Sequence, residues 1–137
     1  MKEMVEHQRK KPFMETSLSI VSEALEAFRE FTGDGDVQIQ TVQVFMRVVM
    51  AGGATIDYAA LEKVTGVSQS AVSRSIKKMS TGPLANPGYG LITVEFDPYD
   101  LRRRIIKVSP RGKELVAAME TRMSPMLKYL SKSGVKV

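Results

Sequence analysis

The spacing of apolar residues predicts helices over most of the chain. Between residues 15 and 31 they fall on two neighbouring helical stripes, Leu18, Val21, Leu25 and Phe28 on one and Ile20, Ala24, Ala27 and Phe31 on the other. Residues 38–50 keep the same period with apolar side chains further round the helix, which predicts a central helix. Shorter helices are predicted at 57–64 and 69–80, with Asp57 and Ser68 as their N-caps.

The pattern changes after a loop at residues 81–88, which holds two Pro and two Gly. Residues 89–96 and 103–108 predict two strands joined by a turn at 97–100. Ser109 and Pro110 then open a last helix, as its N-cap and first residue. Pro125 is expected to kink or restart this helix. Residues 1–14 lack periodicity and contain Pro12, which predicts a flexible arm.

This order of elements is typical of a winged helix-turn-helix, a mainly α fold with a small β-hairpin. Gly66 suits the turn between the third and fourth helices, because Gly tolerates a positive φ. We expect a single domain over 15–137, with a DNA-binding lobe at about 38–112. The apolar faces of the helices at 15–31 and 113–133 are too wide for one small core, so these two helices are expected to form a homodimer.

Composition excludes several function classes. The chain has no Cys and one His, His7, so a disulfide framework, a thiolate zinc site and a cysteine nucleophile are excluded. No cofactor or metal is expected. The carboxylates are scattered and no nucleophile–base set or Gly-rich phosphate loop is visible, so an enzyme is not expected. No stretch approaches the roughly 20 apolar residues of a membrane span, and no signal peptide is visible, so a cytoplasmic protein without a membrane partner is expected.

Positive charge is concentrated in one part of the chain. Residues 67–113 carry nine Lys or Arg against three Asp or Glu, more than the whole net charge of +5. Clustered positive charge is the footprint of a polyanion partner. In the fourth helix, short polar residues and Arg can reach base edges, and Lys can pair with phosphates.

The wing adds three consecutive arginines. Alternation would place Arg102 and Arg104 on one side and Arg103 on the other, and Arg is favoured in the minor groove. Asp100 could hold an arginine extended by a bidentate ion pair. The candidate DNA-binding residues are Ser68, Gln69, Ser70, Ser73, Arg74, Lys77, Lys78, Asp100, Arg102, Arg103 and Arg104.

Residues 38–123 resemble the MarR family of bacterial regulators. Four stretches carry the resemblance: Gly66-Val67-Ser68-Gln69-Ser70-Ala71-Val72-Ser73-Arg74, Gly90-Leu91-Ile92, Asp97-Pro98-Tyr99-Asp100-Leu101-Arg102-Arg103 and Val108-Ser109-Pro110-Arg111-Gly112. The resemblance implies a homodimer on a palindromic double-stranded DNA operator, with the recognition helix in the major groove and the wing in the minor groove. Many members respond to small amphipathic ligands, so an effector is a further partner to test.

The chain departs from the family pattern at several points. Glu62 stands where helix-turn-helix units usually carry a small residue, which predicts looser or shifted packing of the two helices. Leu101 replaces the first of the paired wing arginines, and the loop from Ser80 to Tyr89 is longer than usual. These departures indicate a divergent member.

The first hypothesis is a sequence-specific, homodimeric transcription regulator. An architectural or replication-associated DNA-binding protein of a phage or mobile element is the alternative, because the same basic surface would serve it. An interaction module that binds a protein through this fold is a third hypothesis. We interpret the apolar stripe of Met119, Met123 and Met126 as core or dimer packing rather than as an effector site, although Met surfaces adapt to ligands.

Overall fold

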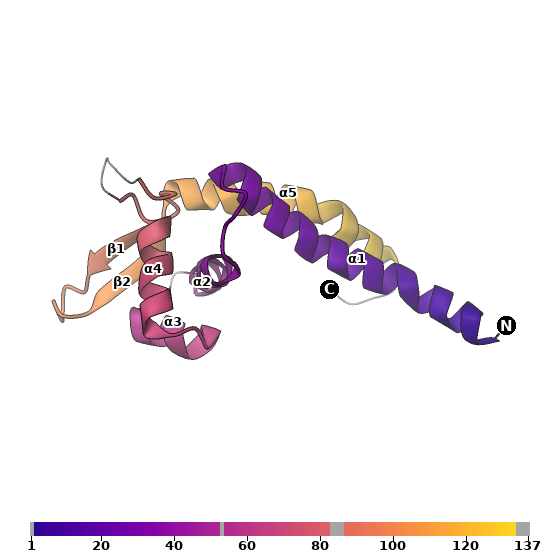
Figure 1. Cartoon of the computed structure of the whole chain (residues 1–137), viewed down its shortest axis with the longest axis horizontal. Helices are drawn as coiled ribbons and strands as arrows, with labels where there is room; N and C mark the ends of the chain where they lie inside the picture. The colour runs from indigo at the N-terminus through magenta and orange to yellow at the C-terminus, as the bar shows by residue number, and fades with distance from the viewer. Residues whose placement is uncertain (1, 53, 83–86, 134–137) are drawn as a thin grey trace. The chain divides into compact units, whose positions relative to one another are not determined.

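The computed structural model describes the backbone of residues 2–52, 54–82 and 87–133, and the side chains of these ranges from residue 14 onward. In chain order its elements are α1 (Lys2–Thr32), α2 (Ile39–Met50), α3 (Tyr58–Thr65), α4 (Gln69–Met79), β1 (Ile92–Phe96), β2 (Arg104–Val108) and α5 (Pro110–Lys132) (Figure 1). Residue 1 of the expected arm, residues 83–86 of the expected loop and the end of the expected domain, 134–137, lie outside the described residues.

The chain divides into two compact units. The first combines Met1–Gly33 with Val116–Val137, and the second is Asp34–Leu115. None of the described helices is long and apolar enough to cross a membrane.

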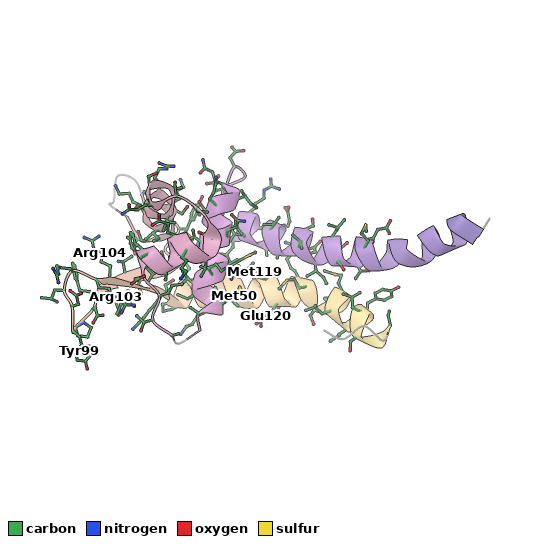
Figure 2. The ribbon with its side chains drawn as sticks, turned by 90° about the horizontal axis from the view of Figure 1, so that it is seen from below. Met50, Tyr99, Arg103, Arg104, Met119 and Glu120 are labelled. Atoms are coloured by element: carbon green, nitrogen blue, oxygen red, sulfur yellow. The ribbon has the colours of Figure 1, made fainter. Side chains whose placement is uncertain are left out.

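In the first unit, α1 lies beside the part of α5 that follows Val116 (Figures 1 and 2). Its buried apolar side chains are Ala24, Ala27 and Phe28 of α1 and Met119 and Leu130 of α5. Arg122 of α5 bridges to α1, because its guanidinium donates to Glu23 at 2.7 Å and to Glu30 at 2.5 Å. These carboxylates raise the pKa of Arg122, and the ion pairs fasten α5 to α1.

Both terminal helices differ from the sequence prediction. The stretch expected to be a flexible arm is helical from Lys2, because Lys, Glu, Gln, Met and Arg are good helix formers even without an apolar stripe. Helix α5 runs unbroken from Pro110 to Lys132, so it is not restarted at Pro125, while the expected kink at this proline stays a prediction. A proline removes one N–H donor, but the hydrogen bonds on either side of it can hold the helix together.

The second unit is built around α2, which packs against α3, α4 and β2. Its inward face buries Val42, Val44, Phe45 and Val48, so the predicted central position is confirmed. The remaining buried apolar side chains of this unit come from every other element: Ile56, Leu61, Val72, Ile76, Met79, Leu91, Ile92, Ile106 and Leu115.

The hairpin is antiparallel, with Ile92 opposite Val108 and Phe96 opposite Arg104. Its first strand begins at Ile92 rather than at residue 89. The cause is that the N–H groups of Tyr89 and Leu91 donate to the last carbonyls of α4, those of Lys78 and Met79, at 2.8 and 2.7 Å. The segment before β1 therefore closes the end of α4 instead of extending the strand.

The first turn of α5 is seated against the start of β1. The Ser109 hydroxyl accepts from the Gly112 N–H at 2.9 Å, which confirms the predicted N-cap, and donates to the Gly90 carbonyl at 2.6 Å. The Ser109 N–H donates to the Leu91 carbonyl at 3.0 Å. A Cβ at Gly112 would lie 2.1 Å from that carbonyl oxygen, so only glycine fits there.

Candidate nucleic-acid interface

Local chemistry defines both ends of the helix-turn-helix. The Asp57 carboxylate accepts from the Ala60 N–H at 2.8 Å and caps α3. Gly66 ends α3 with a φ of 69°, a conformation that other residues rarely adopt. Ser68 caps α4 by accepting from the Ala71 N–H at 3.3 Å. Both N-caps and the glycine turn are as the sequence predicted.

Helix α4 separates its residues onto two faces. Val72, Ser75, Ile76 and Met79 are buried against the core. The sequence-predicted DNA-binding residues of this helix are all exposed: Gln69, Ser70, Ser73, Arg74, Lys77 and Lys78. Ser68 is exposed as well, and its hydroxyl lies 3.4 Å from that of Ser70. The outer face of α4 is therefore polar near its start and basic along its length.

Glu62 does not disturb the packing of α3 on α4. Its side chain is exposed, while the neighbouring Leu61 is completely buried. The expectation that Glu62 would loosen or shift the contact is therefore wrong, because this residue lies on the solvent side of α3.

The tip of the wing consists of two consecutive β-turns. In the first, the Asp100 N–H donates to the Asp97 carbonyl at 3.3 Å, and the Asp97 carboxylate accepts from the Tyr99 N–H at 2.8 Å. In the second, the Arg103 N–H donates to the Asp100 carbonyl at 2.9 Å, and the Asp100 carboxylate accepts from the Arg102 N–H at 3.1 Å. Each turn is thus opened by an aspartate that bonds the backbone two residues on, as Asp does in turns.

Arg103 joins the wing to the helix-turn-helix. Its Nε donates to Asp57 at 2.8 Å, and its Nη1 donates to Asp97 at 3.2 Å. A backbone hydrogen bond from Ala60 and the guanidinium of Arg103 lower the pKa of Asp57. The Tyr99 N–H and Arg103 lower the pKa of Asp97 likewise, and the two carboxylates raise that of Arg103. Arg103, predicted as a DNA-binding residue, thus holds two carboxylates of its own chain.

Arg102 and Asp100 form a looser pair than the sequence suggested. The Arg102 Nε lies 3.5 Å from the Asp100 oxygen that also accepts the Arg102 N–H, so one oxygen serves both groups and the expected bidentate clamp is absent. The Arg102 side chain is 96% exposed. The pair leaves the guanidinium extended at the tip and accessible to a partner.

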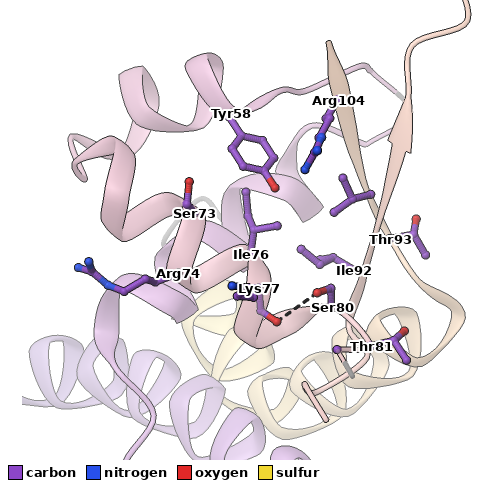
Figure 3. Close-up of a pocket in the computed structure, with 12 residues that line it drawn as sticks. Tyr58, Ser73, Arg74, Ile76, Lys77, Ser80, Thr81, Ile92, Thr93 and Arg104 are labelled. Atoms are coloured by element: carbon purple, nitrogen blue, oxygen red, sulfur yellow. Dashed lines mark hydrogen bonds between the residues drawn. The ribbon is translucent and has the colours of Figure 1, made fainter. Parts of the chain in front are cut away.

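An open groove of about 680 Å³ lies between α4 and the hairpin. Figure 3 shows Tyr58 and Arg104 directed into it, with Lys77 and Ser80 along the α4 side. Arg104 lies over the ring of Phe96 at 5.5 Å, on the exposed face of the hairpin. The residues lining the groove are Tyr58, Ser73, Arg74, Ile76, Lys77, Ser80, Thr81, Gly82, Ile92, Thr93, Val94 and Arg104. Three of them are cationic and none is acidic.

Lys78 lies at a second hollow, of about 330 Å³, on the other side of α4. Its Nζ is 5.4 Å from the centre of the Tyr89 ring, and the Tyr89 hydroxyl donates to the Asp34 carboxylate. Burial and this carboxylate raise the pKa of Tyr89, and the hydroxyl lowers that of Asp34. Lys78 therefore contacts the segment that closes the end of α4, whereas Arg74 lines both hollows.

The structure adds residues that sequence reasoning missed. Tyr58 and Thr93 line the groove, and Asp57 pairs with an arginine 46 residues away. One signal in the sequence indicated the separate role of Arg103. The alternation of the wing arginines placed it on the opposite side from Arg102 and Arg104. Within the described part of the chain, no group of three or more His, Asp or Glu side chains could hold a metal ion.

Solved structures share this architecture at low sequence identity. A mutant of S. aureus MepR bound to an oligodeoxyribonucleotide matches with a TM-score of 0.68 and 16% identity, over 90% of this chain and 82% of that one. The transcriptional regulator Tm0710 from Thermotoga maritima matches with a TM-score of 0.64 and 17% identity, over 99% and 83%. S. aureus MepR bound to ethidium bromide matches with a TM-score of 0.64 and 16% identity, over 90% and 81%.

No protein-family model matches the chain, and no curated protein sequence matches it. The structural likeness nevertheless extends over most of the chain and of each neighbour. Together with the capped helix-turn-helix and the antiparallel hairpin, it confirms the fold expected from the sequence: the chain has the winged-helix architecture of these solved structures.

Proposed function

We propose that this chain is a sequence-specific, homodimeric DNA-binding transcription regulator of the cytoplasm, and not an enzyme. Helix α4 would enter the major groove and the wing the minor groove. The observation that carries the proposal is the groove between α4 and the hairpin, which Arg74, Lys77 and Arg104 line without an acidic neighbour among its lining residues. The phosphate backbone of DNA binds to a surface of this kind, when side chains that read the bases lie along one of its edges.

The order of side chains on α4 also supports DNA reading. Gln69, Ser70 and Ser73 are exposed before the basic stretch begins. Short polar side chains can approach base edges, and an arginine can bond the two acceptors of guanine. The lysines further along the helix are placed to pair with phosphates. The DNA-bound MepR mutant, which shares this fold, is consistent with this use of it.

Exposed apolar side chains of the first unit support a homodimer. Met14, Leu18 and Val21 of α1 are 55–63% exposed, and Tyr129 of α5 is 51% exposed. The three α1 residues recur at helical spacing, so they form one apolar stripe along the helix. Apolar patches of this kind mark association surfaces. A twofold dimer would present two copies of α4, which calls for a palindromic site.

A small-molecule effector is a finer part of the proposal. The ethidium-bound MepR shares the fold, and the effector class would be amphipathic. Binding would raise the Tm of the DNA-free protein as ethidium bromide is added, because a ligand of the native state stabilises it. Met119 is buried and Met123 and Met126 are half-buried, which supports the packing role expected for the methionine stripe.

The experiment that tests the function is selection of bound sequences from a random duplex library, followed by footprinting. A regulator should recover one palindrome and protect it with sharp boundaries. Recovery of random sequence, with protection that has no boundary, would favour the architectural alternative. Absence of any duplex binding would overturn both DNA-binding hypotheses.

Arg74 gives the proposal a residue-level test. Arg74→Ala should weaken binding to the selected site more than to random duplex, because a lost base contact costs about 1–3 kcal/mol of specific binding. Arg29→Ala on α1 is the matched control, since it removes the same charge from the other unit. Equal losses of affinity on both duplexes would reassign Arg74 to a phosphate contact.

A further inference from the structure

We infer that the tip of the wing carries an apolar wedge, Leu101 with Tyr99 in the preceding turn, which enters the minor groove and kinks the duplex at a base step. This inference rests on the proposed function and adds a deformation of the DNA to it. It is carried by three features of the tip: its exposure, its rigidity and its charge.

The tip exposes two large apolar side chains to solvent, although a solvated turn does not require them. Leu101 is 73% exposed and Tyr99 is 97% exposed. Figure 2 shows Tyr99 extending from the end of the hairpin, away from the rest of the second unit. Single exposed apolar residues are ordinary on protein surfaces, but two of them at one hairpin tip form a site for contact.

The backbone beneath these side chains is held firmly. Hydrogen bonds within the two β-turns fix each corner of the tip, and the carboxylates of Asp97 and Asp100 each bond a backbone N–H two residues on. Arg103 then anchors the tip to Asp57 at the start of α3. A wedge that is already rigid loses little conformational freedom on insertion, so more of its contact energy goes into deforming the partner.

Charge identifies the partner as a nucleic acid. Leu101 and Arg102 are the two central residues of the same β-turn, so an almost fully exposed guanidinium stands next to the wedge. Arg104 lies at the start of β2, on the groove between the hairpin and α4. The minor groove offers the matching combination, a negative potential at its edges and apolar base faces between its steps. Proteins that insert Leu or a similar side chain there kink the duplex by roughly 20–90°.

The test measures DNA shape as well as affinity. A duplex containing the selected sequence carries a donor and an acceptor dye at its two ends, and a second copy carries 2-aminopurine at successive steps of the minor-groove contact. The wild-type chain should raise energy transfer and unquench 2-aminopurine at one step per half-site. The double variant Tyr99→Ala, Leu101→Ala should lose both signals and bind about tenfold more weakly, because it removes the buried apolar area of the wedge.

Two controls keep the result specific. Tyr99→Phe with Leu101→Met preserves size and apolar character, so it should keep the kink and the affinity. Met50→Ala removes an apolar side chain that is 71% exposed at the end of α2, and it should change neither signal. Because all these residues are exposed, each variant should unfold at the wild-type Tm.

The outcomes separate the wedge from the function on which it rests. If the wild-type chain binds its selected site without added energy transfer or 2-aminopurine signal, the wedge is overturned and the regulator stands. If the double alanine variant bends DNA as the wild type does, the wedge is overturned as well. If the double variant instead changes only self-association in sedimentation, the tip is a protein contact and the wedge fails. If no duplex is bound at all, the proposed function fails first.

Discussion

At the scale of single residues, the wing depends on aspartates whose two oxygens have different partners. One oxygen of Asp57 caps α3 and the other accepts from Arg103. In Asp97, one oxygen accepts from the Tyr99 N–H and the other from Arg103. All four bonds require the ionised carboxylate or are strengthened by it, which is why the pKa of each aspartate lies below its ordinary value.

This lowering of the pKa predicts how stability changes in acid. A carboxyl group whose pKa is lower in the folded state stabilises the fold above its unfolded pKa of about 4, and this contribution disappears as pH falls through the folded value. The wild-type chain should therefore lose stability below about pH 4, and Asp57→Asn should lose less over the same range. Urea unfolding at a series of pH values measures the difference. Glu114→Gln, an exposed change on α5, should leave the wild-type profile intact.

Arg102 and Asp100 carry opposite charges, yet replacing either one with alanine should weaken DNA binding. Arg102→Ala should weaken DNA binding and reduce the salt dependence of log Kd by about one ion. Asp100→Ala should also weaken binding although it removes a negative charge, because the Asp100 oxygen holds both the N–H and the Nε of Arg102. Titrations of the selected duplex at several salt concentrations give both results. Tighter binding by Asp100→Ala would refute the positioning role of Asp100.

At the scale of elements, short-range rules account for what the sequence could predict. Asp57, Gly66, Ser68 and Ser109 act within three or four residues of their own positions, and each was found in its predicted role. The prediction failed where no local pattern exists. The first turns of α1 carry good helix formers without an apolar period, and they were interpreted as an arm. The Arg103–Asp57 pair joins residues 46 positions apart, so no local motif in the sequence predicts it.

The seat of α5 gives an element-scale prediction. Gly112→Ala should destabilise the second unit by about 1–3 kcal/mol, the range for forcing an extra methyl into a packed site. The new Cβ would collide with the Leu91 carbonyl, which already accepts the Ser109 N–H. Chemical denaturation measures the loss. Lys113→Ala, an exposed change in the same turn of α5, should stay within about 0.5 kcal/mol of the wild type.

At the scale of the whole molecule, the two units of the chain have separate tasks in the proposal. The second unit holds α4, the hairpin and the groove between them. The first unit carries an exposed apolar stripe and no part of that groove. A change on the groove of the second unit should therefore alter DNA contacts, whereas a change on the stripe of the first unit should alter the association of two chains.

Leu18 tests this division. Leu18→Glu places a charge in the middle of the apolar stripe on α1, so it should convert the dimer into a monomer. Sedimentation equilibrium should change from twice 15.2 kDa to that mass. Binding to a palindrome should weaken strongly, while binding to a single half-site should change little. Ser19→Glu, an exposed neighbour outside the stripe, is the matched control. A wild-type chain that sediments as a monomer would contradict the dimer itself.

The double use of Asp57 has a consequence for grafting. Wings and helix-turn-helix units look like exchangeable parts, yet here one carboxylate belongs to both, since it caps α3 and receives Arg103 from the hairpin. A chimera that imports a hairpin without an arginine at this position would leave Asp57 charged and half-paired, and an imported α3 without the aspartate would leave Arg103 bonded to Asp97 alone. Transplants that move residues 57 and 103 together should fold with an anchored wing, and those that move either one alone should not.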